Sequence, residues 1–172
     1  MAIIPIFIVM GMLSGILTAI LMRGHLIVPG LLYGIAISFC FYVLHIQKVW
    51  YKILGFITVS CIAIYLSFYI YALLTPHVSN YSPFDNTLVQ FCMAGMAGAL
   101  SLAIGIKFLL APLNYIHLSL LTIFGGLLVI FCNLIPAENK WGLLYFVWQT
   151  GMALAFGICI KFNEGKTVIG KI

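Results

Sequence analysis

Long apolar segments dominate the sequence, and isolated charged residues separate them. The windows without charge cover residues 1–22, 24–47, 53–84, 86–106, 108–137 and 141–160. A transmembrane helix needs about 20 apolar residues, so even the longest windows, 53–84 and 108–137, are too short for two spans and a turn. Polar stretches that contain proline, at 75–84 and 111–114, shorten both of them. The pattern therefore assigns one helix to each window.

The predicted fold is an all-α polytopic integral membrane protein with six transmembrane helices. The predicted spans are about 3–22, 26–46, 52–74, 87–109, 115–135 and 141–160, within a single transmembrane domain, 1–172, whose last part, 161–172, is a short cytoplasmic tail. The strands of a membrane barrel alternate polar and apolar residues over about ten positions, whereas these segments are apolar on every face. Pro29 and Gly30 are expected to break the first turn of the second helix and to free carbonyl groups there.

Composition narrows the function classes. Of 172 residues, 65% are hydrophobic and 6% are charged, and the mean hydropathy is +1.22. Soluble domains carry about 25% charged residues, so a cytosolic enzyme, a nucleic-acid-binding protein and a secreted disulfide scaffold are excluded. The five cysteines all lie inside predicted spans and form no CxxC pair, which favours small apolar filler over a metal site. The predicted partner is the lipid bilayer, and we predict no cofactor and no metal.

The basic residues predict the orientation. If the N-terminus is cytoplasmic, Arg23 and Lys140 lie outside, and six lysines lie on the cytoplasmic side: Lys48, Lys52, Lys107, Lys161, Lys166 and Lys171. The positive-inside rule places the richer side in the cytoplasm. We therefore predict that both termini are cytoplasmic, in a plasma (inner) membrane.

Two segments show a weak internal similarity. Residues 10–18 and 93–101, in the first and fourth predicted helices, share small residues at several positions. One interpretation is a 3+3 inverted repeat, in which the second set of three helices enters the membrane from the opposite face. The other is chance, because a chain rich in Gly, Leu, Ile and Phe aligns with itself readily.

Small residues recur at four-residue spacing along several helices. The candidates for close helix packing are Gly11, Gly15, Gly30, Gly34, Ala94, Gly98, Ser101 and Gly105. Such stripes allow helix backbones to approach closely in lipid, where hydrophobic association is absent. They predict packing within the chain or, alternatively, docking of a second copy in a homo-oligomer or of another membrane subunit.

The polar groups at membrane depth are uncharged. No Asp, Glu, Lys or Arg lies in the middle of a predicted span, so we predict that the protein is not an enzyme. The candidates for a solute path are Gln149, Tyr145, Trp148, Gln90, Asn133 and Tyr33. Gln149 alternatively holds a neighbouring helix by hydrogen bonding. His25 and His77, on the outer side, are either a pH gate or merely solvated residues.

Two function classes follow. The first is a small transporter, channel or substrate-binding transport subunit for a neutral or weakly polar solute, without an intramembrane carboxylate for proton coupling. The second is a non-transporting interaction protein, such as an anchor, assembly factor or immunity-type partner, that docks through its small-residue stripes. In size and topology the chain is similar to the substrate-capture subunits of vitamin importers and to small urea or amide channels. The similarity rests on no signature residue.

Overall fold

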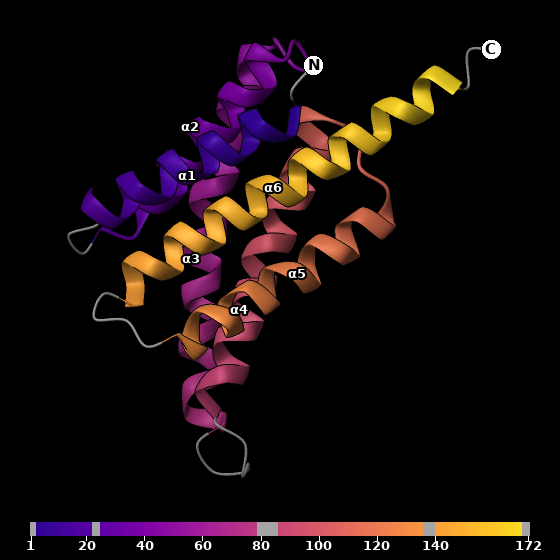
Figure 1. The fold of residues 1–172 in the computed structure, drawn as a ribbon. Helices are drawn as coiled ribbons and strands as arrows, with labels where there is room; N and C mark the ends of the chain where they lie inside the picture. The colour runs from indigo at the N-terminus through magenta and orange to yellow at the C-terminus, as the bar shows by residue number, and fades with distance from the viewer. Residues whose placement is uncertain (1–2, 22–24, 79–85, 136–139, 170–172) are drawn as a thin grey trace.

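The computed structural model describes residues 3–21, 25–78, 86–135 and 140–169, without the side chains of 75–78, 86–87 and 164–169. These residues form six helices and one π-helical turn (Figure 1). The elements are α1 (Ile3–Leu21), α2 (Ile27–Val43), α3 (Trp50–Val78), α4 (Asn86–Gly105), the π-helical η1 (Ile106–Leu110), α5 (Tyr115–Leu134) and α6 (Lys140–Ile169). Five helices are long and apolar enough to cross a membrane, and α2 is a shorter apolar helix. The predicted all-α, six-helix membrane fold is confirmed.

Two predicted helix ends are wrong because a charge or a proline marks a boundary that the helix crosses. Helix α3 continues through Pro76 to Val78; a proline in the last turn removes one backbone bond and leaves the preceding turns intact. Helix α6 continues to Ile169, so most of the predicted tail is helical. Lys161 is where the apolar sequence ends, but it is no obstacle to a helix that leaves the membrane.

Two other details of the prediction also change. Helix α2 includes Pro29 in its first turn, where the missing N–H has no intrahelical acceptor in any case, so this turn is not broken. The same helix ends at Val43 instead of near residue 46, because the chain turns back through His45, whose φ is 58°. At the end of α4 the backbone shifts to π-helical bonding, and the Ala111 amide donates to the Ile106 carbonyl at 2.8 Å.

The helices form a closed bundle in which sequence neighbours pack together and the last helix returns to the first. Helix α1 packs on α2 and α6, α3 packs on α2 and α4, and α5 packs on α4 and α6. Figure 1 shows α1 beside α6, and it shows the end of α3 and the start of α4 extending past the other helices. Helix α2 also contacts α6 across the bundle.

The outer surface of the bundle is apolar, as lipid contact requires. Phe108 and Ile116 are 72% and 69% exposed, which in water would be an aggregation hazard. The rings of Trp50, Tyr115 and Trp141 are exposed near helix ends, where an interfacial aromatic belt is expected. The chain is therefore built as a multi-pass membrane protein.

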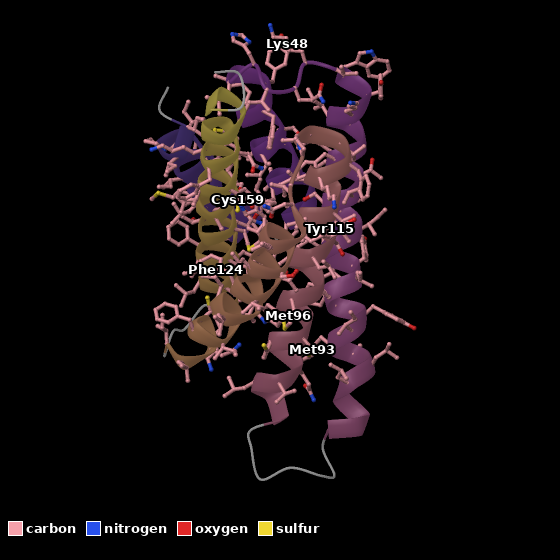
Figure 2. All side chains as sticks on the ribbon, turned by 90° about the vertical axis from the view of Figure 1, so that its right-hand side faces the viewer. Lys48, Met93, Met96, Tyr115, Phe124 and Cys159 are labelled. Carbon is pink, nitrogen blue, oxygen red and sulfur yellow. The ribbon has the colours of Figure 1, made fainter. Side chains whose placement is uncertain are left out.

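The two ends of the bundle differ in charge. The connections 44–49 and 111–114 lie at one end, which we call the lysine-rich end because Lys48, Lys52 and Lys107 lie there. Figure 2 shows Lys48 at one extreme of the molecule and Met93, near the start of α4, toward the other. Two side-chain amides form hydrogen bonds between segments at the lysine-rich end. Gln47 Nε2 donates to the Leu109 carbonyl at 3.2 Å, and Asn163 Nδ2 donates to the Pro112 carbonyl at 2.8 Å.

The helix contacts bear on the inverted repeat without testing it. The pairs α1–α2 and α4–α5, α2–α3 and α5–α6, and α1–α6 and α4–α3 are those that two three-helix units would form. Gly34, Phe39 and Cys40 also match Gly126, Phe131 and Cys132 at a constant sequence offset. However, Gly34 packs on α3, whereas Gly126 packs on α4. These two glycines lie in interfaces that the repeat does not relate. The repeat therefore stays a prediction.

Candidate functional site

A cavity of about 70 Å³ lies between α3, α4, α5 and α6, in the half of the bundle away from the lysine-rich end. Its walls come from four helices: Ile64, Ser67, Phe68 and Tyr71 of α3, Phe91, Ala94 and Gly95 of α4, Val129 of α5, and Trp141, Leu144, Tyr145 and Trp148 of α6. Half of these residues are aromatic, and none is charged. We call this space the aromatic cavity.

Four rings pack around the end of the aromatic cavity that lies nearest the start of α6. Phe68 and Trp141 stack with their centroids 5.9 Å apart, Tyr71 lies 4.9 Å from Phe91, and Phe91 lies 6.2 Å from Trp141. Such contacts add to the free energy of apolar burial when the rings are offset or edge to face. The four rings join α3, α4 and α6 where α6 begins, so they set the spacing of these helices around the cavity.

Trp148 forms the opposite end of the cavity wall, and its indole is held in place by contacts with two other helices. Its Nε1 donates to the Gly125 carbonyl on α5 at 3.2 Å, and its ring lies 6.0 Å from that of Tyr33 on α2. Gly125 also lies where α4 and α5 approach closely, with the Gly95 carbonyl 3.0 Å from a Cβ built on Gly125. The indole is therefore held by one hydrogen bond to α5 and by packing against the Tyr33 ring of α2.

Gln149 does not line the aromatic cavity and instead joins α6 to α1 and α2. Its side chain is fully buried, and its Oε1 accepts from Ser14 Oγ at 2.7 Å. Its Nε2 donates to Thr18 Oγ1 at 3.3 Å and to the Pro29 carbonyl at 3.3 Å. A buried amide in lipid must find such partners, and this one binds three groups on two neighbouring helices. We call Gln149, Ser14, Thr18 and the Pro29 carbonyl the amide junction.

The other predicted path residues are dispersed. Tyr33 is buried behind Trp148, and its hydroxyl has no hydrogen-bond partner within the described residues. Gln90 is buried one turn before Ala94, and Asn133 Nδ2 donates to the Val129 carbonyl of its own helix at 3.1 Å. Of the six candidates, Tyr145 and Trp148 line the cavity. The six do not form one polar path.

Of the predicted pH gate, His25 is exposed before α2, and the side chain of His77 lies outside the described residues.

The glycine stripes face other helices of the same chain. A Cβ on Gly11 would lie 2.6 Å from Ala153 Cβ, and one on Gly15 would lie 2.7 Å from Phe146 Cα, so both face α6. Gly30 and Gly34 face α3 in the same way. On α4, Gly98 and Gly105 also face α3, Ala94 lines the aromatic cavity, and Ser101 Oγ donates to the Ala97 carbonyl of its own helix at 2.9 Å.

Sequence analysis missed most of the cavity wall. Phe68, Tyr71 and Phe91 were not candidates, and Trp141 fitted an interfacial belt. The four- and three-residue steps from Ile64 to Phe68 and Tyr71 place them on one helical face. Tyr65 and Tyr69 on another face of α3 are exposed, so aromatic spacing alone does not separate the wall from the lipid surface.

Comparisons with known proteins add no assignment. No protein-family model, curated protein or solved structure matches the chain. Among the described residues, no three His, Cys, Asp or Glu side chains cluster so as to hold a metal ion. The case for a function therefore rests on the aromatic cavity and its walls.

Proposed function

We propose that the protein is a small membrane transport protein, or the substrate-capture subunit of one, that binds a small neutral and largely apolar solute in the aromatic cavity. The observation that carries the proposal is a charge-free cavity with six aromatic rings in its wall, placed between four helices and away from the lysine-rich end. Mostly apolar clefts between helices are common ligand sites.

The wall favours an apolar solute over a strongly polar one. Ser67 Oγ already donates to the Ala63 carbonyl at 2.8 Å, and Trp148 Nε1 donates to the Gly125 carbonyl. The amide of Gln149, which a polar solute would use, belongs to the amide junction. Apart from the hydroxyls of Tyr71 and Tyr145 and the indole N–H of Trp141, the wall offers rings and aliphatic groups, and a charged solute would lose its hydration without a compensating charge.

The volume limits the size of the solute. An apolar cavity of about 150 Å³ holds benzene, whereas this one measures about 70 Å³. The proposed solute therefore has only a few heavy atoms. Since no carboxylate lies in the wall to carry a coupling proton, the proposed mechanism is passive permeation or capture for a separate energising partner.

Filling the cavity is expected to abolish binding. Ala94 is buried in the wall, so Ala94→Leu occupies the space without removing a side-chain hydrogen bond. In a Trp50→Phe background, the remaining tryptophans, Trp141 and Trp148, both report on the cavity. Titration with isopropanol, isobutanol and propionamide should give a saturable fluorescence change with at least one of them, and Ala94→Leu should remove it. Stopped-flow flux of a poorly membrane-permeant ligand into proteoliposomes then tests transport.

Ala72→Leu is the matched control, because Ala72 lies on the exposed face of α3 and outside the wall. It should bind like the parent. Equal binding by Ala94→Leu, or no saturable change with any of the three probes, would contradict the proposed site. Binding without flux would leave capture for a partner as the mechanism.

We propose further that the lysine-rich end faces the cytoplasm of a plasma (inner) membrane, as the six-to-two distribution of basic residues favours. A reporter fused after Ile172 should behave as cytoplasmic, and one inserted between Val78 and Tyr81 as external. Alkaline phosphatase and fluorescent-protein fusions measure the two outcomes with opposite responses. The reverse pattern would place the aromatic cavity in the cytoplasmic half.

A further inference from the structure

A second hollow lies on the lipid-facing surface between α4 and α5, and we propose that it binds one anionic phospholipid of the leaflet at the lysine-rich end. The groove has a volume of about 410 Å³ and is lined by Leu100 of α4 and by Tyr115, Leu118, Ser119, Thr122 and Ile123 of α5. It shares no residue with the aromatic cavity. We call it the α4–α5 groove.

The floor of the α4–α5 groove is suited to a hydrocarbon chain. Leu100 and Ile123 are exposed to the membrane. The two aliphatic hydroxyl groups already donate within α5: Ser119 Oγ donates to the Tyr115 carbonyl at 3.1 Å, and Thr122 Oγ1 donates to the Leu118 carbonyl at 2.8 Å. Between its ends the groove thus offers mainly apolar surface, with the Tyr115 hydroxyl at the end nearest Lys107, and an acyl chain can pack along it.

A cation stands at one end of this groove. Lys107, in η1, places its Nζ 3.6 Å from the centroid of the Tyr115 ring, and Tyr115 is the groove residue nearest the start of α5. A cation over a ring face is attracted to it, and the ammonium keeps N–H groups for a second partner. In Figure 2, Tyr115 lies nearer to Lys48 than Met93 does, so the cation is on the lysine-rich side.

Charge complementarity selects an anionic headgroup. Six lysines and one acidic residue, Glu164, belong to the lysine-rich end by the order of the spans, so this end attracts anions. Basic sites between transmembrane helices at the cytoplasmic face recognise phospholipid headgroups. Each lysine near an anionic membrane surface contributes about 1 kcal/mol to the free energy of binding. A phosphate at Lys107 and an acyl chain in the groove together form one phospholipid molecule, which a free inorganic anion does not reproduce.

Native mass spectrometry of the detergent-purified protein with phosphatidylglycerol and with phosphatidylcholine tests the site. We expect one phosphatidylglycerol molecule to bind more tightly than phosphatidylcholine. Lys107→Gln should lower the affinity for phosphatidylglycerol about fivefold, which is the factor that corresponds to the contribution of one lysine. Lys48→Gln removes the same charge from the same end but away from the groove, and should change the affinity less than twofold. Inorganic phosphate alone should not stabilise the protein against heat.

A second variant tests the groove independently of charge. Ser119 is exposed and its only described side-chain bond is within α5, so Ser119→Trp fills the groove while the bundle keeps its packing. This variant should also lower the affinity for phosphatidylglycerol, although Lys107 is intact. Equal losses for Lys48→Gln and Lys107→Gln, equal affinity for the two lipids, or unchanged binding by Ser119→Trp would each overturn the proposal. Solute binding in the aromatic cavity should persist in all three variants.

Discussion

Gly15→Leu is expected to lower the free energy of unfolding by roughly 3 kcal/mol, at the upper end of the usual cost of overpacking. A Cβ at position 15 would lie 2.7 Å from the Phe146 Cα, and a backbone atom cannot rotate away as a side-chain tip can. Helix α1 would have to move off α6, which would also pull Ser14 and Thr18 away from Gln149. Unfolding in detergent mixtures, followed by circular dichroism, measures the loss.

A pair of alanine variants provides the matched comparison. Gly15→Ala places only the offending Cβ, whereas at Gly55 the same atom would meet the Leu109 methyl groups at 3.4 and 3.6 Å, an ordinary contact. Because alanine favours a helix by about 1 kcal/mol over glycine, Gly55→Ala should be neutral or stabilising, while Gly15→Ala should destabilise. If Gly15→Leu left both the stability and the size in detergent unchanged, the close α1–α6 contact would be wrong.

Gln149→Leu is expected to destabilise the protein by about 2–4 kcal/mol through loss of the amide junction. Interhelical hydrogen bonds in membranes contribute about 0.6 kcal/mol each on average, and stranded buried partners cost about 1–3 kcal/mol more. Ser14 retains the Gly11 carbonyl at 3.1 Å, so most of the penalty falls on Thr18 and the Pro29 carbonyl, which both lose the amide. Thermal unfolding in detergent gives the shift.

Asn133→Leu is the control, since the described bond of its amide is to its own helix. It should cost less than about 1 kcal/mol, the net worth of one such bond. The same variants separate structure from transport. If Gln149→Leu kept full stability but lost solute binding, the amide would belong to the solute path, and the assignment of Gln149 to helix packing would be wrong.

The helices were predictable because each physical boundary of the membrane leaves a mark in the sequence. Lys52, Asp85 and Lys107 separate apolar runs, and every run long enough to span a membrane contains one helix or most of one. What charge marks is the edge of the hydrocarbon layer, whereas a helix ends where its backbone bonds end. For this reason α6 runs past Lys161, and the π-helical turn at Ile106–Leu110 left no mark at all.

The contents of the site were less predictable, because they depend on which helix faces which. Burial of an amide showed that Gln149 needs partners, but the partner Ser14 lies 135 residues away on α1, and no local period points to it. Trp141 shows the converse. Its place at a helix start fits an interfacial belt, and only the approach of α3 and α4 brings Phe68 and Phe91 against it.

The contact of the last helix with the first has a consequence for biosynthesis. Helix α1 is synthesised before the other five helices, and the amide that binds Ser14 and Thr18 is made only when α6 is synthesised. Until then α1 presents those hydroxyls, and the glycine face that will receive α6, to lipid or to the insertion machinery. Each helix can insert separately, but the ring closes only afterwards by lateral association in the bilayer. A ribosome stalled before residue 149 would therefore leave five helices whose first member lacks its main partner.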